Sequence, residues 1–188
     1  MGKKTGMAAC GIMANMKEPR ISAIVSVGKN REIGKQDHLL WRLDGDFARM
    51  KELIKGHPLI MGRRTYESIG CELPSPSVVI TSDPDYTSPY AKANHTFVVT
   101  SMEAALAKAQ EIENTSINDE KEIFIFGGSR VYTDALPYTG RLYVTEIEAT
   151  DPEADSFFPE YKHEFPQVLE EIVQEENGIS YKLLTLDR

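Results

Sequence analysis

An aspartate on the inner face of an expected helix is the first residue whose type and position suggest chemistry. In the segment Asp44–Lys55, apolar residues recur with helical spacing, and Asp46 falls within the same arc as Phe47 and Met50. A carboxylate on a buried face needs hydrogen-bonding partners, and such a group suits general-acid chemistry near neutral pH. Alternatively, Asp46 only complements the positive end of the helix, although Asp44 already suits that capping position. Spacing alone leaves both interpretations open.

Two apolar segments each run into glycine and then into the start of an expected helix. One junction extends from Ile123 to Arg130 through Gly127 and Gly128, and the other, Leu59–Thr65, contains two arginines. Glycine lets a ligand approach the backbone, and the N–H groups of a helix N-terminus favour phosphate. The arginines would suit the 2′-phosphate that distinguishes NADP from NAD. A full GxGxxG pattern is absent, so a simple tight strand exit stays open as the alternative.

Few other residues suggest chemistry. Trp41, the only tryptophan, directly precedes the helix that bears Asp46, although a lone tryptophan is more often a core anchor. The four histidines and the cysteines Cys10 and Cys71 have no metal-ligand spacing, so we expect no metal site. Four glutamates in the polar middle of the chain are expected in solvent: Glu111, Glu113, Glu120 and Glu122.

The elements that must position these residues alternate along the chain. Strands are expected at Ile21–Val27, Pro58–Met61, Val78–Thr81, Thr96–Thr100, Glu122–Phe126, Arg141–Glu148, Val168–Glu175 and Ser180–Leu186. Helices are expected at Asp44–Lys55, Arg63–Ile69, Ser101–Gln110 and Ser129–Ala135. Asn177-Gly178 is a strong hairpin signal between the last two strands. This order predicts an α/β fold with a mostly parallel sheet and an antiparallel C-terminal edge.

Length and charge limit the class of protein. A chain of 188 residues fits one domain, which we expect at 21–188 after a disordered tail at 1–20. The net charge of −8 argues against nucleic acid or an anionic membrane as the partner. Two unpaired cysteines and the lack of a long apolar run favour the cytoplasm.

Five motifs in a fixed order give a resemblance to a known family. They are Ile33-Gly34, Leu40-Trp41 with Asp46 five residues after the tryptophan, MGRxTxxSIG at 61–70, GGxxxY at 127–132, and the Leu142–Ile147 strand. From about Ile21 to Leu186 the chain resembles dihydrofolate reductase. The resemblance implies a twisted eight-stranded sheet with four flanking helices. It also implies a monomer that reduces dihydrofolate to tetrahydrofolate with NADPH in one-carbon metabolism, and that is a target of antifolates.

The resemblance also assigns residues to roles. Asp46 would bind the pterin ring and favour protonation at N5 before hydride reaches C6, supported by Thr145, by Trp41 and by Leu39 on a mobile loop. The substrate would be bound by Ile24, Val25, Asp46, Phe47, Met50, Lys51, Ile69, Phe126, Tyr132 and Thr145. The cofactor would be bound by Ser26, Ile33, Gly34, Gly62, Arg63, Arg64, Thr65, Thr81, Ser82, Gly127, Gly128, Ser129, Arg130, Val131 and Tyr132.

One departure from the family concerns the substrate's glutamate tail. The family has an arginine that binds the tail's α-carboxylate, and here Pro76 or Ser77 falls at that place. Lys51 or Lys55 would substitute as looser charges, so we expect weaker dependence on the tail. Two alternatives follow: a reductase of another, tail-free pterin or of a riboflavin-pathway pyrimidine, and a pterin- or NADPH-binding protein without catalysis.

Overall fold

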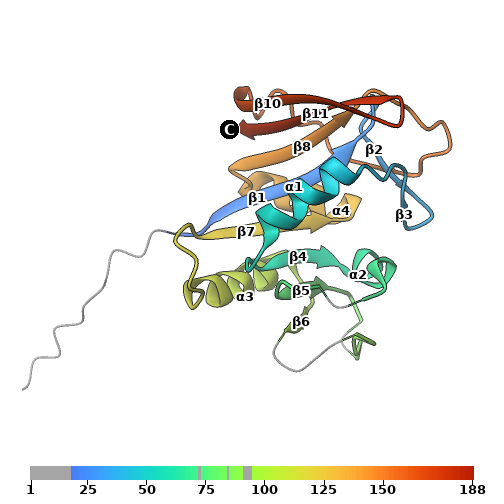
Figure 1. Ribbon diagram of the computed structural model, residues 1–188. Helices are drawn as coiled ribbons and strands as arrows, with labels where there is room; N and C mark the ends of the chain where they lie inside the picture. Colours follow the sequence, from blue (N-terminus) through green and yellow to red (C-terminus); the bar gives the residue numbers. More distant parts are fainter. Residues whose placement is uncertain (1–17, 72, 84, 91–94) are drawn as a thin grey trace, which may run out of the picture.

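An eight-stranded sheet forms the centre of the computed structural model, which describes residues 18–71, 73–83, 85–90 and 95–188 (Figure 1). In spatial order the strands are β10 (Gln167–Glu176), β11 (Ile179–Asp187), β8 (Arg141–Ile147), β1 (Arg20–Val27), β7 (Glu122–Gly127), β4 (Leu59–Gly62), β5 (Ser77–Ile80) and β6 (Thr96–Val99). Neighbouring strands are parallel from β6 to β8, and β11 and β10 are antiparallel. The predicted fold class is confirmed. Most of the predicted tail, residues 1–17, lies outside the described residues, and β1 begins one residue before the predicted domain start.

Two helices pack against each face of the sheet. On one face, α1 (Asp44–Ile54) and α2 (Arg63–Ile69) share an apolar cluster with Leu59, Met61 and Phe124. On the other, α3 (Met102–Asn114) and α4 (Ser129–Ala135) pack with Ile60 and Ile125. This division follows from strand geometry, because successive side chains of a strand point to opposite faces. A 3₁₀ turn, η1 (Leu136–Tyr138), continues from α4.

A small second sheet, which the sequence did not predict, ties two loops together. It consists of β3 (His38–Leu39), β2 (Glu32–Lys35) and β9 (Ser156–Phe157) in that order. Beyond the strand pairing, the Gln36 backbone N–H donates to Oδ2 of Asp155 at 2.8 Å. The connection between β1 and α1 is therefore an ordered flap, held against the segment that precedes β10.

Neither a membrane-spanning helix nor a metal-binding cluster of acidic, histidine or cysteine side chains is found in the described part of the chain. The longest helix there, α3, has 13 residues. A membrane span needs about 20.

Candidate active site

Asp46 lies where β1 and β8 end, with one hydroxyl donor on each carboxylate oxygen. The Ser26 hydroxyl donates to Oδ2 at 2.5 Å, and the Thr145 hydroxyl donates to Oδ1 at 2.6 Å. Ser26 and Thr145 are register partners on adjacent parallel strands, so their side chains point to the same face. Ser26, which was expected at the nicotinamide end, therefore contacts the acid itself. The partly buried carboxylate has the partners that its helical position demanded.

Helix α1 brings Asp46 to this position in its first turn. Its N-cap residue, Leu43, has no side-chain group for capping. Asp44, which was expected to complement this positive end of the helix, is its first residue and lies in the first turn, but no side chain at the N-cap position accepts a helix N–H. The carboxylate of Glu176, at the end of β10, instead accepts the backbone N–H groups of Asp44 and Gly45 at 2.9 and 3.2 Å. No sequence pattern near α1 could have revealed a cap from so distant a residue.

Trp41 packs directly on the end of β1. A Cβ atom added to Gly28 would lie 2.5 Å from Cη2 of Trp41, so only glycine leaves room for the indole. The ring joins a small apolar cluster with Leu43 and Tyr181. Trp41 thus acts as a core anchor and also fixes the chain five residues before Asp46.

Apolar residues expected at the pterin divide between the two faces of the sheet. Ile24, Met50, Ile69 and Phe126 pack in the cluster on the face that bears α1. Val25 and Tyr132 pack in the cluster beneath α3 and α4, together with the cofactor candidates Ile33 and Val131. The other two substrate candidates lie on α1, where Arg42 stacks over Phe47 at 5.3 Å from the ring centre and Lys51 is exposed.

Tyr132 connects the two faces at the sheet edge. Its hydroxyl donates to the backbone carbonyl of Ile24 at 2.7 Å. Burial, together with the negative charge of Asp46, holds the pKa of Tyr132 well above its usual value. The hydroxyl therefore stays protonated and acts as a fixed donor.

The two glycine junctions lie side by side. Strands β4 and β7 are neighbours in the sheet, with Met61 opposite Gly127. A Cβ atom on Gly128 would lie 3.1 Å from Oγ1 of Thr65, so one junction contacts the other. The N-cap residues of α2 and α4 are Gly62 and Gly128, which have no side chain to cap the helix N–H groups. This paired backbone cradle, with both helix N-termini at one edge, fits the pyrophosphate of a dinucleotide.

Arginines flank this cradle on the α2 side. Arg63 stacks over the ring of Tyr86 at 5.5 Å, and its Nη1 lies 3.5 Å from Oδ2 of Asp83. Arg64 is exposed, and so is Ser82. Asp83, which the sequence analysis overlooked, places a negative charge beside the arginine expected to bind a phosphate.

The remaining cofactor candidates lie at several places around this edge. Thr81 is buried, and its hydroxyl accepts the Asp83 N–H at 3.2 Å. On α4, Ser129 donates to the carbonyl of Phe157 at 2.5 Å, and Arg130 projects into solvent with 93% of its side chain exposed. Gly34 pairs with Leu39 in the small sheet, and Leu39 is 66% exposed. These contacts tie α4 to the flap that carries Leu39.

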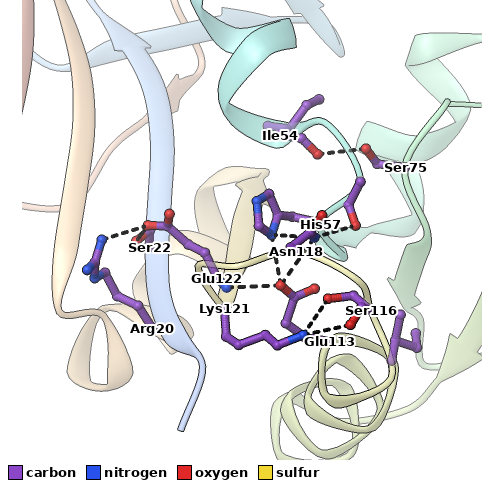
Figure 2. A network of polar contacts seen from close by, with 12 residues as sticks. Arg20, Ser22, Ile54, His57, Ser75, Glu113, Ser116, Asn118, Lys121 and Glu122 are labelled. Carbon is purple, nitrogen blue, oxygen red and sulfur yellow. Dashed lines mark hydrogen bonds and ion pairs between the residues drawn. The ribbon is translucent and has the colours of Figure 1, made fainter. Parts of the chain in front are cut away.

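A second group of buried acids lies at the opposite end of the sheet (Figure 2). Glu113 accepts hydrogen bonds from the Glu122 backbone N–H at 3.1 Å and the Asn118 amide at 3.4 Å, and its Oε1 lies 2.9 Å from Nδ1 of His57. Glu122 accepts a hydrogen bond from the Ser22 hydroxyl. Both acids were expected in solvent, and that prediction is wrong: Glu113 is 0% exposed and Glu122 is 8% exposed.

Comparisons with known proteins agree with this arrangement. The family model described as dihydrofolate reductase matches residues 20–188. The chain is 39% identical to the dihydrofolate reductase of Bacillus subtilis (strain 168) over 142 residues, 75% of this chain and 76% of that protein. It is 35% identical to the type 3 dihydrofolate reductase of Salmonella typhimurium over 171 residues, 89% of this chain and 98% of the other.

A solved structure has the same fold. The dihydrofolate reductase of Enterococcus faecalis, complexed with NADP(H) and RAB-propyl, superimposes with a TM-score of 0.76 at 30% identity, covering 91% of this chain and 97% of that one. In this chain one fold brings together the sheet order, the inward aspartate and the paired glycine junctions. The chain is therefore a member of the dihydrofolate reductase family.

Proposed function

We propose that the protein reduces 7,8-dihydrofolate to 5,6,7,8-tetrahydrofolate with NADPH, in one-carbon metabolism. The observation that carries this proposal is the partly buried Asp46 carboxylate, held by Ser26 and Thr145 at the same sheet edge as the glycine cradle. An acid beside an apolar face and a dinucleotide cradle are the two parts that such a reduction needs.

Asp46 orients the pterin. A carboxylate has about four lone-pair positions, of which the two hydroxyl donors take one on each oxygen. The other positions accept two parallel N–H donors, as the N3–H and 2-amino groups of a pterin provide, in a charge-assisted pair. The negative charge then stabilises the ring once N5 has taken a proton from solvent. Reduction of the N5=C6 bond is completed by a hydride at C6.

The cofactor supplies that hydride when it is bound. We assign the pyrophosphate to the backbone around Gly62, Gly127 and Gly128, with Thr65 between the two junctions. Arg63 and Arg64 would bind the 2′-phosphate of the adenosine end. The flap of β2 and β3, held by β9, would cover the nicotinamide end at Ile33 and Gly34 and exclude water.

The glutamate tail is bound differently from the family pattern. The sequence has no arginine between Arg64 and Arg130. Directly before the expected place, the buried Ser75 hydroxyl donates to the Ile54 carbonyl at 2.7 Å, which closes the loop onto the end of α1. Exposed Lys51 or Lys55 is then the charge for the tail carboxylates, and a flexible ammonium binds them less tightly than an arginine fork.

The test follows NADPH absorbance with dihydrofolate and with a dihydropterin that lacks the tail. We expect both to be reduced, with a loss of kcat/KM on truncation below about tenfold, the size of one exposed charge contact. Lys51→Met or Lys55→Met should raise KM for dihydrofolate only, and Lys108→Met, on α3, serves as the control. Failure to reduce either substrate contradicts the proposed activity, and a much larger loss on truncation contradicts the tail assignment.

We also infer that the enzyme acts as a cytoplasmic monomer on small molecules. The net charge of −8 disfavours nucleic acid and anionic membranes. One edge strand of the sheet, β10, carries Glu170, Glu171, Glu175 and Glu176, which would repel one another in a dimer formed through this edge.

A further inference from the structure

The N-terminus of α1 is capped by a residue from another part of the fold. The first N–H groups of a helix have no partner within it, and Leu43 cannot supply one. Glu176 meets this need with both oxygens: Oε1 accepts from the Asp44 N–H at 2.9 Å and Oε2 from the Gly45 N–H at 3.2 Å. Because Glu176 comes directly before the Asn177-Gly178 turn, the β10–β11 hairpin is joined to the first turn of α1.

The contact between hairpin and helix is close enough to require glycine. A Cβ atom on Gly45 would lie 2.4 Å from the Tyr181 hydroxyl and 2.7 Å from Oε1 of Gln174. Tyr181 is only 2% exposed, and its hydroxyl donates to that same Gln174 oxygen at 2.7 Å. The backbone at Gly45 therefore packs against the hairpin in one position. Asp46 directly follows Gly45 in the chain.

Charge favours the same arrangement. A negative group at a helix N-terminus interacts favourably with the helix dipole. Burial, and then the negative charges of Glu176, Asp46 and Asp44, raise the pKa of Tyr181. The hairpin thus adds negative charge near the position that the protonated pterin would occupy.

We propose that Glu176 is a positioning residue for the reduction. By capping α1, it fixes the backbone at Asp46 so that both carboxylate oxygens meet Ser26, Thr145 and the pterin together. This inference rests on the role proposed above for Asp46. Glu176 itself does not touch the substrate, so its effect must pass through Asp46.

The direct test compares Glu176→Gln with Glu175→Gln in single-turnover hydride transfer to dihydrofolate. Glu175 is exposed and has no hydrogen bond or ion pair with α1 among the described residues, so its variant removes the same charge without the cap. Loss of a helix cap changes an equilibrium by about five- to tenfold, and we expect a slowing of that size for Glu176→Gln only. The thermal midpoint of Glu176→Gln should fall by about 2–4 °C, the size of one lost cap, while the NADPH dissociation constant, read from fluorescence, should not differ between the two variants. Equal rates for the two variants would overturn the proposal.

A double-mutant cycle separates the cap from the activity itself. With Asp46→Asn as background, Glu176→Gln should change the rate by less than about twofold, because the positioned carboxylate is gone. An equal slowing in both backgrounds would show a general structural effect and overturn the positioning role. If Asp46→Asn alone keeps the wild-type rate, the proposed mechanism fails, and Glu176 has no carboxylate to position.

Discussion

Asp46 and Glu113 are both carboxylates on helices, at opposite ends of the same sheet. Asp46 lies near the last residue of β1. Glu113 bonds to the backbone of Glu122, and Glu122 is the register partner of the first residue of β1. Asp46 is partly exposed and has a single hydroxyl on each oxygen. Glu113 is fully buried, and one oxygen meets a ring nitrogen, an amide and a backbone N–H.

The difference lies in what remains open to a ligand. Glu113 Oε2 is buried without a hydrogen-bond partner among the described residues, yet no solvent reaches it. Its network joins α3 to the turn after α1 and so holds the fold together (Figure 2). Asp46 keeps both access and lone pairs. Of the two acids, the less buried one is therefore the one that a ligand can reach.

The largest expected effect is on the rate and separates the two acids. Asp46→Asn should slow hydride transfer at pH 7 by roughly 10²-fold or more, the scale of a lost acid–base group. Glu113→Gln should leave the rate within about twofold. Stopped-flow NADPH absorbance measures both. Similar losses in the two variants would break the comparison.

The loss of stability should be larger for a change at Glu113 than for a change at Asp46. Glu113→Ala leaves the Glu122 N–H and the His57 ring without their acceptor, so we expect a loss of about 3 kcal/mol in the free energy of unfolding. Asp46→Asn should cost less than about 1 kcal/mol, because the amide is partly solvated. Urea unfolding monitored by circular dichroism measures this, and a larger loss for Asp46→Asn would contradict it.

The next largest effect is expected from removing a hydroxyl group that donates to Asp46. Thr145→Val removes one charge-assisted hydrogen bond at almost constant volume and should lower kcat by about tenfold. The matched control is Thr139→Val, since that buried hydroxyl donates to the Ala135 carbonyl at 3.0 Å, away from the acid. An equal loss of kcat in the control would show that packing, not the hydrogen bond to Asp46, matters.

The smallest effect concerns a third carboxylate, Asp187, in a two-bond ion pair. Arg141 donates to both of its oxygens, at 2.7 and 2.9 Å, and holds the pKa of Asp187 below its usual value. A carboxyl group whose pKa is lower in the folded state stabilises the fold at pH values above its pKa in the unfolded chain. That stabilisation disappears as the pH falls through its pKa in the folded state. Asp187→Asn should thus cost less than about 1 kcal/mol at pH 7 and less still below about pH 4. Unfolding at both pH values checks this, and a constant difference would refute it.

Sequence periodicity predicted what is local and missed what is brought together by the fold. The spacing of apolar residues within a single segment predicts each strand and helix. It also predicts that Asp46 lies on the inner face of its helix. Helix α3 runs four residues past its predicted end at Gln110, since Ile112 and Glu113 face the core. Glu113 meets His57 across 56 residues, and Glu176 meets Gly45 across 131. No local sequence pattern reveals such distant partners, so Glu113 and Glu122 were expected in solvent.

The pH dependence of single-turnover hydride transfer, wild type against Asp46→Asn, tests the central claim most directly. If Asp46 favours the proton on N5, its loss should matter most at high pH, and acid should partly restore the rate as solvent protonates the substrate. The deficit should therefore narrow steadily from pH 8 to pH 5, by about tenfold or more. A wild-type rate in the variant at pH 8, or a deficit that does not change with pH, would contradict the account.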